Sequence, residues 1–478
     1  MQAILTKIRA ALNGIPDLTN RLLFDWLREH WSGLYRARSY VYSSLWVVPF
    51  GAIVVEQITV RLTAALSAWM TASGRMDPAT ALLGFSLAGA RSALETINTL
   101  TLSFLVFTFG SLLVAVQVAG GQYTPRVIAT IFLSNRVVRA CVGLFVVTLF
   151  FAFNTLVRMD SAVDQVNTAI SVLFGVLSVV TFLFLIDYAA RMLRPVSIVA
   201  AVGKLGLAVI RSVYPHPTTR PASVEPSLRL EPRARTVTNV ATSGVVLAVR
   251  VEALVRLARS AGGVIELVPQ VGDFLAADEP VFHLHGHAST VRDAELRATV
   301  ALGEERTLEQ DPSFSFRILV DIAIKALSAA INDPTTAVLA IDQLHRLLRR
   351  VGLQDLRGNQ VRDSAGEVRV IFRTPNWEDY VHLACTEIRH CGVGSIQIAR
   401  RMRAMLENLM QTMPLHRHAE LRQQLVLLDR AVEALYKVPE DLALARIPDS
   451  QGLGGSLGVQ AVSEDAAPQA GEQRPETT

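Results

Sequence analysis

The sequence predicts an α-helical membrane protein with four transmembrane helices and a cytoplasmic α+β domain. Two observations lead to this fold class. Hydrophobic residues make up 51% of the 478 residues and the mean hydropathy is +0.34, which is too apolar for a wholly soluble chain. Charged residues still make up 18%, which is too many for a purely membranous chain. A chain of two differently built parts is therefore expected.

Residues 1–39 are expected to form an interfacial helix, because apolar residues recur at helical spacing with arginines between them. No cleavable signal peptide is evident, so the first span, near residues 40–62, must act as its own insertion signal. Glu56 lies near the far end of this span, and Asn154 lies near the end of the third span. A position at the water interface is a simpler interpretation of both residues than a proton or cation path.

The stretch from Leu100 to Ala119 is the clearest span, because about 20 residues without a charge can cross a bilayer core as a helix. Polar residues at its end indicate a site at the cytoplasmic mouth of the bundle, for an ion, a lipid headgroup or a gating partner. The alternative is that an arginine snorkels to phosphates and an amide bonds across the bundle. The candidate residues are Gln117, Gln122, Tyr123 and Arg126.

The third and fourth spans are expected near residues 137–157 and 169–186, which completes a transmembrane domain of residues 40–190. Basic residues gather before the first span, between the second and third, and after the fourth. The positive-inside rule therefore predicts that both termini are cytoplasmic in a bacterial inner membrane. Residues 196–213 could be a fifth span, but their short, glycine-broken and centrally charged sequence favours a helix on the inner surface.

A proline-rich linker ends at residue 239, and residues 240–290 read as a β-rich, barrel-like module. Its order of strand, short helix, strand, Gly-Asp turn and strand resembles half of a lipoyl barrel. No lysine stands at the hairpin tip, so no prosthetic group is expected. His283, His285 and His287 alternate and could share one strand face, but no carboxylate or cysteine has matching spacing for a metal.

Residues 291–445 are expected to form a helical domain with a β-hairpin, followed by a disordered tail over residues 446–478. A second polar cluster lies at its start. Three of its members are spaced by four residues and share one helix face, which suggests a ligand or subunit interface, or else an internal ion-pair network with a helix cap. The members are Gln310, Asp311, Arg317, Asp321, Lys325, Asn332 and Asp333.

Two motifs in these stretches resemble those of the DUF2254 family, bacterial membrane proteins with a domain of unknown function. The first is the Gln-Tyr-Thr-Pro-Arg sequence of residues 122–126. The second motif consists of four matched segments, residues 310–311, 319–323, 325–328 and 331–337. The resemblance covers roughly residues 15–440. It implies transmembrane helices followed by a soluble segment, and the family has no settled activity. Ala329–Ala330 stand where the family pattern has Pro-Gly, which suggests a more helical loop here.

No enzymatic activity is expected, because the chain has no phosphate-binding loop, nucleophile elbow or zinc-protease motif. Its three cysteines provide no disulfide framework and no paired metal signature, so no metal or other cofactor is expected. The net charge of +4 is modest, and no nucleic-acid partner is expected.

Two functions remain. The first is an oligomeric channel- or transporter-like protein with a cytoplasmic regulatory domain. Four spans make too small a bundle for most pores, so this function requires a homo-oligomer. The alternative is a non-transporting scaffold or sensor that displays an interaction domain to a cytoplasmic protein partner. In either case the lipid bilayer is the immediate partner.

Overall fold

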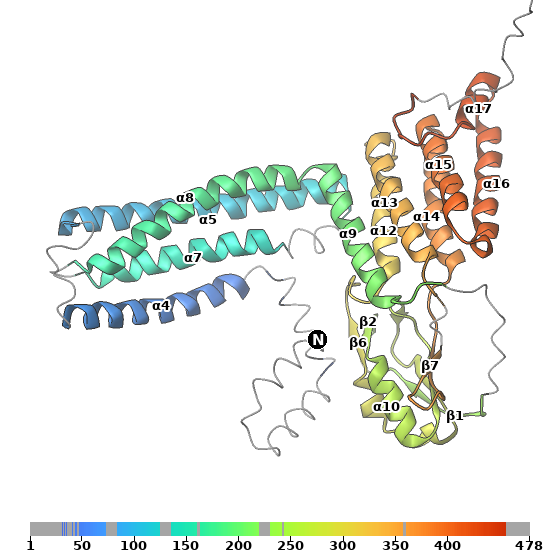
Figure 1. The fold of residues 1–478 in the computed structure, drawn as a ribbon, viewed down its shortest axis with the longest axis horizontal. Coiled ribbons are helices and arrows are strands. Elements are labelled where there is room, and N and C mark those ends of the chain that lie inside the picture. Colours follow the sequence, from blue (N-terminus) through green and yellow to red (C-terminus); the bar gives the residue numbers. More distant parts are fainter. Residues whose placement is uncertain are drawn as a thin grey trace, which may run out of the picture.

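The computed structural model describes residues 47–72, 84–124, 135–159, 163–218, 230–240, 243–356 and 360–455, together with Trp31, Gly33, Tyr35, Val41 and Ser44. Long helices form a bundle at one end of the molecule (Figure 1). The C-terminal region, residues 195–455, lies at the other end and contains a helical part and a β part. Most of the predicted N-terminal helix lies outside the described residues.

The bundle contains four long helices that contact one another along their lengths. They are α4 (Val47–Ala72), α5 (Leu87–Gln122), α7 (Arg136–Val157) and α8 (Gln165–Met192). Local capping fixes three of the starts: Ser86 begins α5, Asn135 begins α7 and Asp164 begins α8, each with a side-chain oxygen on a backbone N–H of the first turn. Helix α5 is one continuous helix of 36 residues, and it begins well before Leu100, where the predicted second span starts.

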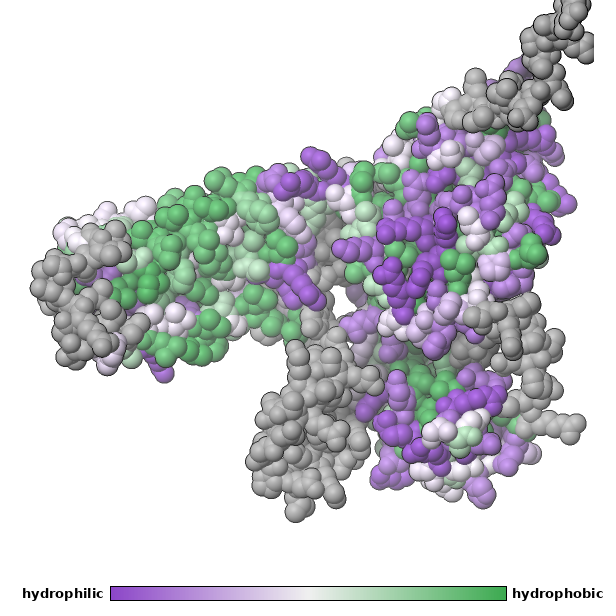
Figure 2. Space-filling model, viewed as in Figure 1, coloured by the Kyte–Doolittle hydropathy of each residue, from purple (hydrophilic) through white to green (hydrophobic). Residues whose placement is uncertain are grey.

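Four described helices are long and apolar enough to cross a membrane: α5, α7, α8 and α9 (Pro195–Val213). The sequence analysis also predicted four spans, but the two sets differ by one member. The predicted first span corresponds to α4, which is not among these four helices, and α9 was not counted as a predicted span. Figure 2 shows hydrophobic side chains over the bundle and hydrophilic ones over much of the C-terminal region. Exposed Phe107, Leu113 and Leu183 belong to this apolar surface, which suits lipid as the surrounding solvent.

Helix α9 runs crosswise to α5 and α8 and packs against α12 (Pro312–Ala326) and α13 (Pro334–Gly352) (Figure 1). Its two central glycines make this approach possible. A Cβ on Gly206 would lie 2.6 Å from Ser315 Oγ, and one on Gly203 would meet the Gln343 side chain. One face of α9 is therefore buried in a hydrophobic cluster that it shares with α12 and α13.

The helical part surrounds the largest hydrophobic cluster among the described residues, which includes the end of α5 and reaches from α9 to α17. Besides α12 and α13 it contains α14 (Trp377–Gly392), α15 (Ile396–Thr412), α16 (His418–Leu435) and α17 (Pro439–Ala445). Beyond α17, residues 446–455 pack back on α15, although the sequence predicted disorder from residue 446. The cause is Arg400, which is fully buried and donates to the carbonyl oxygens of Ile447 and Gly454 at 3.0 and 2.7 Å.

The β part contains two sheets, ordered β1-β5-β3-β8-β7 and β4-β2-β6. The first sheet holds β1 (Arg233–Thr238), β3 (Val264–Leu267), β5 (Pro280–His285), β7 (Gln360–Arg362) and β8 (Val368–Phe372). The second holds β2 (Gly244–Val249), β4 (Phe274–Leu275) and β6 (Val300–Gly303). Short helices α10 (Val251–Ala261), η2 (Gly286–Thr290) and α11 (Asp293–Arg297) connect strands.

The topology does not show the predicted lipoyl-like module. The expected strands, short helix and turn are present in the expected order, but β3 pairs in parallel with β8. Strand β8 comes from the hairpin far along the chain, so a remote segment completes the sheet. The segment before the bundle also contributes: Trp31 and Tyr35 are buried against β2 and β6, and Arg250 lies 5.6 Å above the Trp31 ring.

Candidate functional site

The two polar motifs meet where α5 ends. Lys325 Nζ, in the last turn of α12, donates a hydrogen bond of 2.9 Å to the carbonyl oxygen of Gly120, in the last turn of α5. The last four carbonyl groups of a helix have no partner within it, and the dipole there favours a cation. Lys325 supplies both a donor and a positive charge to the end of an apolar helix.

Tyr123 anchors the same end of α5 to the C-terminal region. It follows directly after α5, is only 4% exposed, and belongs to the hydrophobic cluster of the C-terminal helices together with Ala119. Burial raises the pKa of its phenol, and the nearby Asp333 carboxylate adds to the rise. We call the contact set Gly120, Tyr123, Lys325 and Asp333 the junction.

The turn between α12 and α13 holds Asp333 in place. Asn332 has a φ of 47°, a left-handed conformation that asparagine tolerates better than most residues. The Asp333 N–H donates to the Ala326 carbonyl oxygen at 2.8 Å, and its carboxylate caps α13 by accepting from the Thr336 N–H at 3.0 Å. The predicted cap is confirmed. Ala329–Ala330 lie in a turn between α12 and α13.

Arg317 and Asp321 form the helix-face pair that their spacing predicted. Arg317 Nε donates to Asp321 Oδ1 at 2.6 Å, and its guanidinium also binds Glu387 of α14, with Nη2 at 3.0 Å from Oε2. The hydrogen bond from Arg317 lowers the pKa of Glu387. The pair therefore acts as an ion-pair network that joins α12 to α14.

Gln310 and Asp311 lie at the opposite end of α12, beside a cavity of about 510 Å3. The Gln310 side-chain oxygen accepts from the Val249 N–H at 3.0 Å, which ties α12 to β2. Asp311 caps α12 by accepting from the Phe314 N–H at 3.1 Å. It is 4% exposed, and its Oδ2 has no hydrogen-bond partner among the described residues. Burial raises the pKa of Asp311 to about 6, and the Arg306 guanidinium opposes this rise.

The residues proposed at the mouth of the bundle have different positions. Gln117 is exposed on α5, so within one chain it faces away from the bundle interior and does not bond across it. Gln122 is the last residue of α5, and its side chain lies outside the described part of the structure. Arg126 lies outside the described residues. Of the four candidates, Tyr123 alone is placed in the junction.

The structure also reveals a buried carboxylate that the sequence interpretation placed at the water interface. Glu56 of α4 is fully buried; its Oε1 accepts from Asn154 Nδ2 of α7 at 2.8 Å, and its Oε2 accepts from Gln57 Nε2 at 2.9 Å. The signal in the sequence was a carboxylate inside an apolar stretch. Its burial could not be read from α4 alone, because α7 supplies the partner.

Within the histidine cluster, His285 has a structural role. The strand ends at His285, as the following Gly286 with a φ of 59° requires. His285 is buried between the Glu231 carbonyl oxygen and the Glu266 carboxylate, while His287 is exposed on η2. No group of three or more potential metal ligands occurs among the described residues.

These features define a membrane protein with several long apolar helices. Its C-terminal region contacts the end of one of these helices, α5. A family model described as "Predicted membrane protein (DUF2254)" matches residues 42–408, and the chain belongs to this family. Similar proteins include uncharacterized protein Rv1290c of Mycobacterium tuberculosis and uncharacterized protein Mb1321c of Mycobacterium bovis. Each is 25% identical over 422 residues, which cover 85% of this chain and 79% of the relative. No solved structure matches the chain.

Proposed function

We propose that the protein is a regulated membrane protein, in which a cytoplasmic C-terminal region senses a signal and acts on the helix bundle through the junction. The observation that carries this proposal is the hydrogen bond from Lys325 to the Gly120 carbonyl oxygen. A simple membrane anchor needs no charged side chain from a folded domain at the end of a span. The buried Tyr123 makes the same end of α5 part of the domain core.

Helix α12 provides the physical connection between signal and membrane. Its N-terminus lies at the cavity and its C-terminus at the junction, and its 15 residues extend over about 22 Å. Both ends carry residues of the same motif, Asp311 and Lys325. Because a packed helix moves as a rigid unit, a shift at the cavity would reach the last turn of α5.

Hydrogen–deuterium exchange of the purified protein tests this coupling. Lys325→Met removes the donor and keeps a side chain of similar length. We expect faster exchange in the last turn of α5 and altered exchange in α7 and α8. Lys437→Met, at an exposed position remote from the junction, is the matched control and should change neither. A change confined to α12 would contradict control of the bundle.

Transport through the bundle is a second candidate function, and the buried Glu56 favours it. Ionisable side chains within membrane segments usually mark ion or proton pathways. A further polar contact lies deeper in the bundle, where the Thr148 and Ser178 hydroxyls are 2.9 Å apart. Thr148 precedes Asn154 by six residues, or about 9 Å along α7. An exposed Gln117 could line a pore only between copies of the chain, so a homo-oligomer remains part of this proposal.

Flux through liposomes that contain the purified protein tests the second candidate. Glu56→Gln should reduce proton or cation flux, while Glu95→Gln, on the exposed surface of α5, should leave it unchanged. Absence of flux in the wild-type protein would favour the scaffold or sensor function and a protein partner for the C-terminal region. Reporter fusions at both termini test their proposed cytoplasmic location in the inner membrane.

A further inference from the structure

We propose that the cavity beside Asp311 binds a small organic amine, with its ammonium group directed at the Asp311 carboxylate. This inference deepens the proposed function by naming the class of signal. Binding itself rests only on the cavity, and the consequence for the bundle rests on the proposed function.

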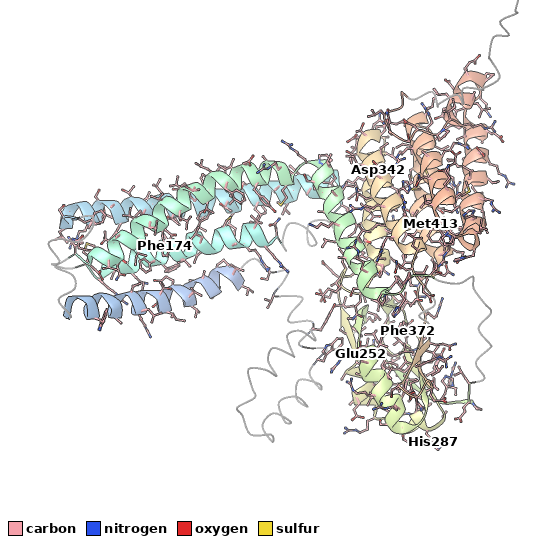
Figure 3. The ribbon with its side chains drawn as sticks, in the orientation of Figure 1. Phe174, Glu252, His287, Asp342, Phe372 and Met413 are labelled. Atoms are coloured by element: carbon pink, nitrogen blue, oxygen red, sulfur yellow. The ribbon has the colours of Figure 1, made fainter. Side chains whose placement is uncertain are left out.

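The cavity lies where three parts of the chain meet. The end of α9 forms one wall, β2, α10 and β3 form the second, and the start of α12 with the end of β8 forms the third. Figure 3 shows Glu252 and Phe372, which both line the cavity, near the level where α9 reaches the β part. Its volume of about 510 Å3 falls within the range of small-molecule sites.

Asp311 supplies the central polar contact. Its Oδ1 is used in capping α12, whereas Oδ2 is buried without a hydrogen-bond partner among the described residues. A buried carboxylate oxygen without a donor is costly, and a ligand N–H would remove that cost. The absence of a side chain on Gly272 allows Oδ2 to approach its backbone closely, because a Cβ there would lie 2.5 Å from Oδ2. Arg306 is close, but its guanidinium donates to the Gly272 carbonyl oxygen.

The remaining lining favours a cation with an apolar body. Glu252 and Asp355 add two carboxylates, against the single guanidinium of Arg373 and the imidazole of His216. Val251, Leu267, Val271 and Phe372 provide apolar walls. A divalent metal would need a cluster of ligand side chains that the described residues do not provide. An amine on a compact hydrocarbon or aromatic skeleton satisfies both the carboxylates and the walls.

Thermal denaturation and calorimetric titration of the full-length protein in detergent test this proposal. The probes are phenethylamine, tyramine and cyclohexylmethylamine, each compared with the alcohol and the carboxylic acid of the same skeleton. We expect at least one amine to raise the melting temperature and to bind with a dissociation constant at least tenfold below those of its alcohol and acid.

Asp311→Asn should lose this preference, because asparagine keeps the helix cap but removes the charge. Asp164→Asn is the matched control: it makes the same change at the N-cap of α8, where the carboxylate accepts from the Asn167 N–H at 3.1 Å, and it should bind the amine as the wild type does. No binding by any amine, equal binding of amine and acid, or unchanged amine binding by Asp311→Asn would overturn the proposal. Binding without altered exchange in α5 would support the site and count against the proposed coupling.

Discussion

Asp311 provides the most direct test of how burial of a charged group affects the free energy of unfolding, because the effect can be worked out from its pKa. The pKa of its carboxyl rises from 3.8 to about 6 through burial; Arg306 lowers it and Asp273 raises it further. A shift of about 2 pH units corresponds to roughly 3 kcal/mol between the two protonation states. The folded state therefore binds the proton more tightly than the unfolded state between these two pKa values. Stability falls as the pH rises through this window, and the full cost is present above pH 6.

Asp311→Asn should remove this cost while retaining the hydrogen bond to the Phe314 N–H. We expect the variant to be more stable than the wild type by about 3 kcal/mol at pH 7, and similar to it near pH 4. Denaturation of both proteins in detergent from pH 4 to pH 8, with Asp164→Asn as the control, measures this difference. A variant that is less stable at pH 7 would refute the reasoning and indicate an ion pair between Asp311 and Arg306. A difference that does not depend on pH would also refute it, because it would show that the ionisation of Asp311 does not affect stability.

Three further predictions concern packing and burial. Gly206→Leu should destabilise the α9–α12 contact by about 1–3 kcal/mol, visible as a lower melting temperature, because the new side chain has no space beside Ser315. Tyr380→Phe should cost about 1–3 kcal/mol in denaturant unfolding, since it leaves the buried Tyr214 hydroxyl without the partner that lies 3.0 Å away; an unchanged midpoint would show that water replaces it. Arg400→Met should release residues 446–455, so limited proteolysis should cleave there faster than in the wild type; equal rates would show that Arg400 does not hold the segment.

Local sequence signals predicted the elements whose ends are fixed by their own residues. Helix α13 begins at the Asp333–Pro334 cap that the sequence indicated. Helix α12 begins in the same way at Asp311–Pro312, although the sequence analysis did not interpret Asp311 as a cap. The apolar stretches of α7 and α8 were also predicted, because their composition alone distinguishes them. Their exact lengths depended on caps that lie in the connecting segments.

The junction could not be predicted, because it joins residues that are far apart in the sequence. Lys325 was expected to pair within its own helix face, yet its Nζ donates to a backbone carbonyl 205 residues away. The partner is a helix end without any side-chain signature. The same limit explains Glu56, whose burial depends on α7. It also explains β3, whose parallel partner β8 follows four helices later in the chain. Periodicity and caps describe each element, but the contacts between elements determine the site.

The most direct test of the central claim is the distance between two spin labels in the bundle, measured by electron resonance with and without the Lys325 contact. Ile58 of α4 and Leu173 of α8 are exposed positions suited to the labels. If the C-terminal region acts on the bundle through the junction, Lys325→Met will shift or broaden the distance distribution, and Lys437→Met will not. Identical distributions in the two variants and the wild type, from folded protein, would contradict the claim and leave the junction as a structural attachment.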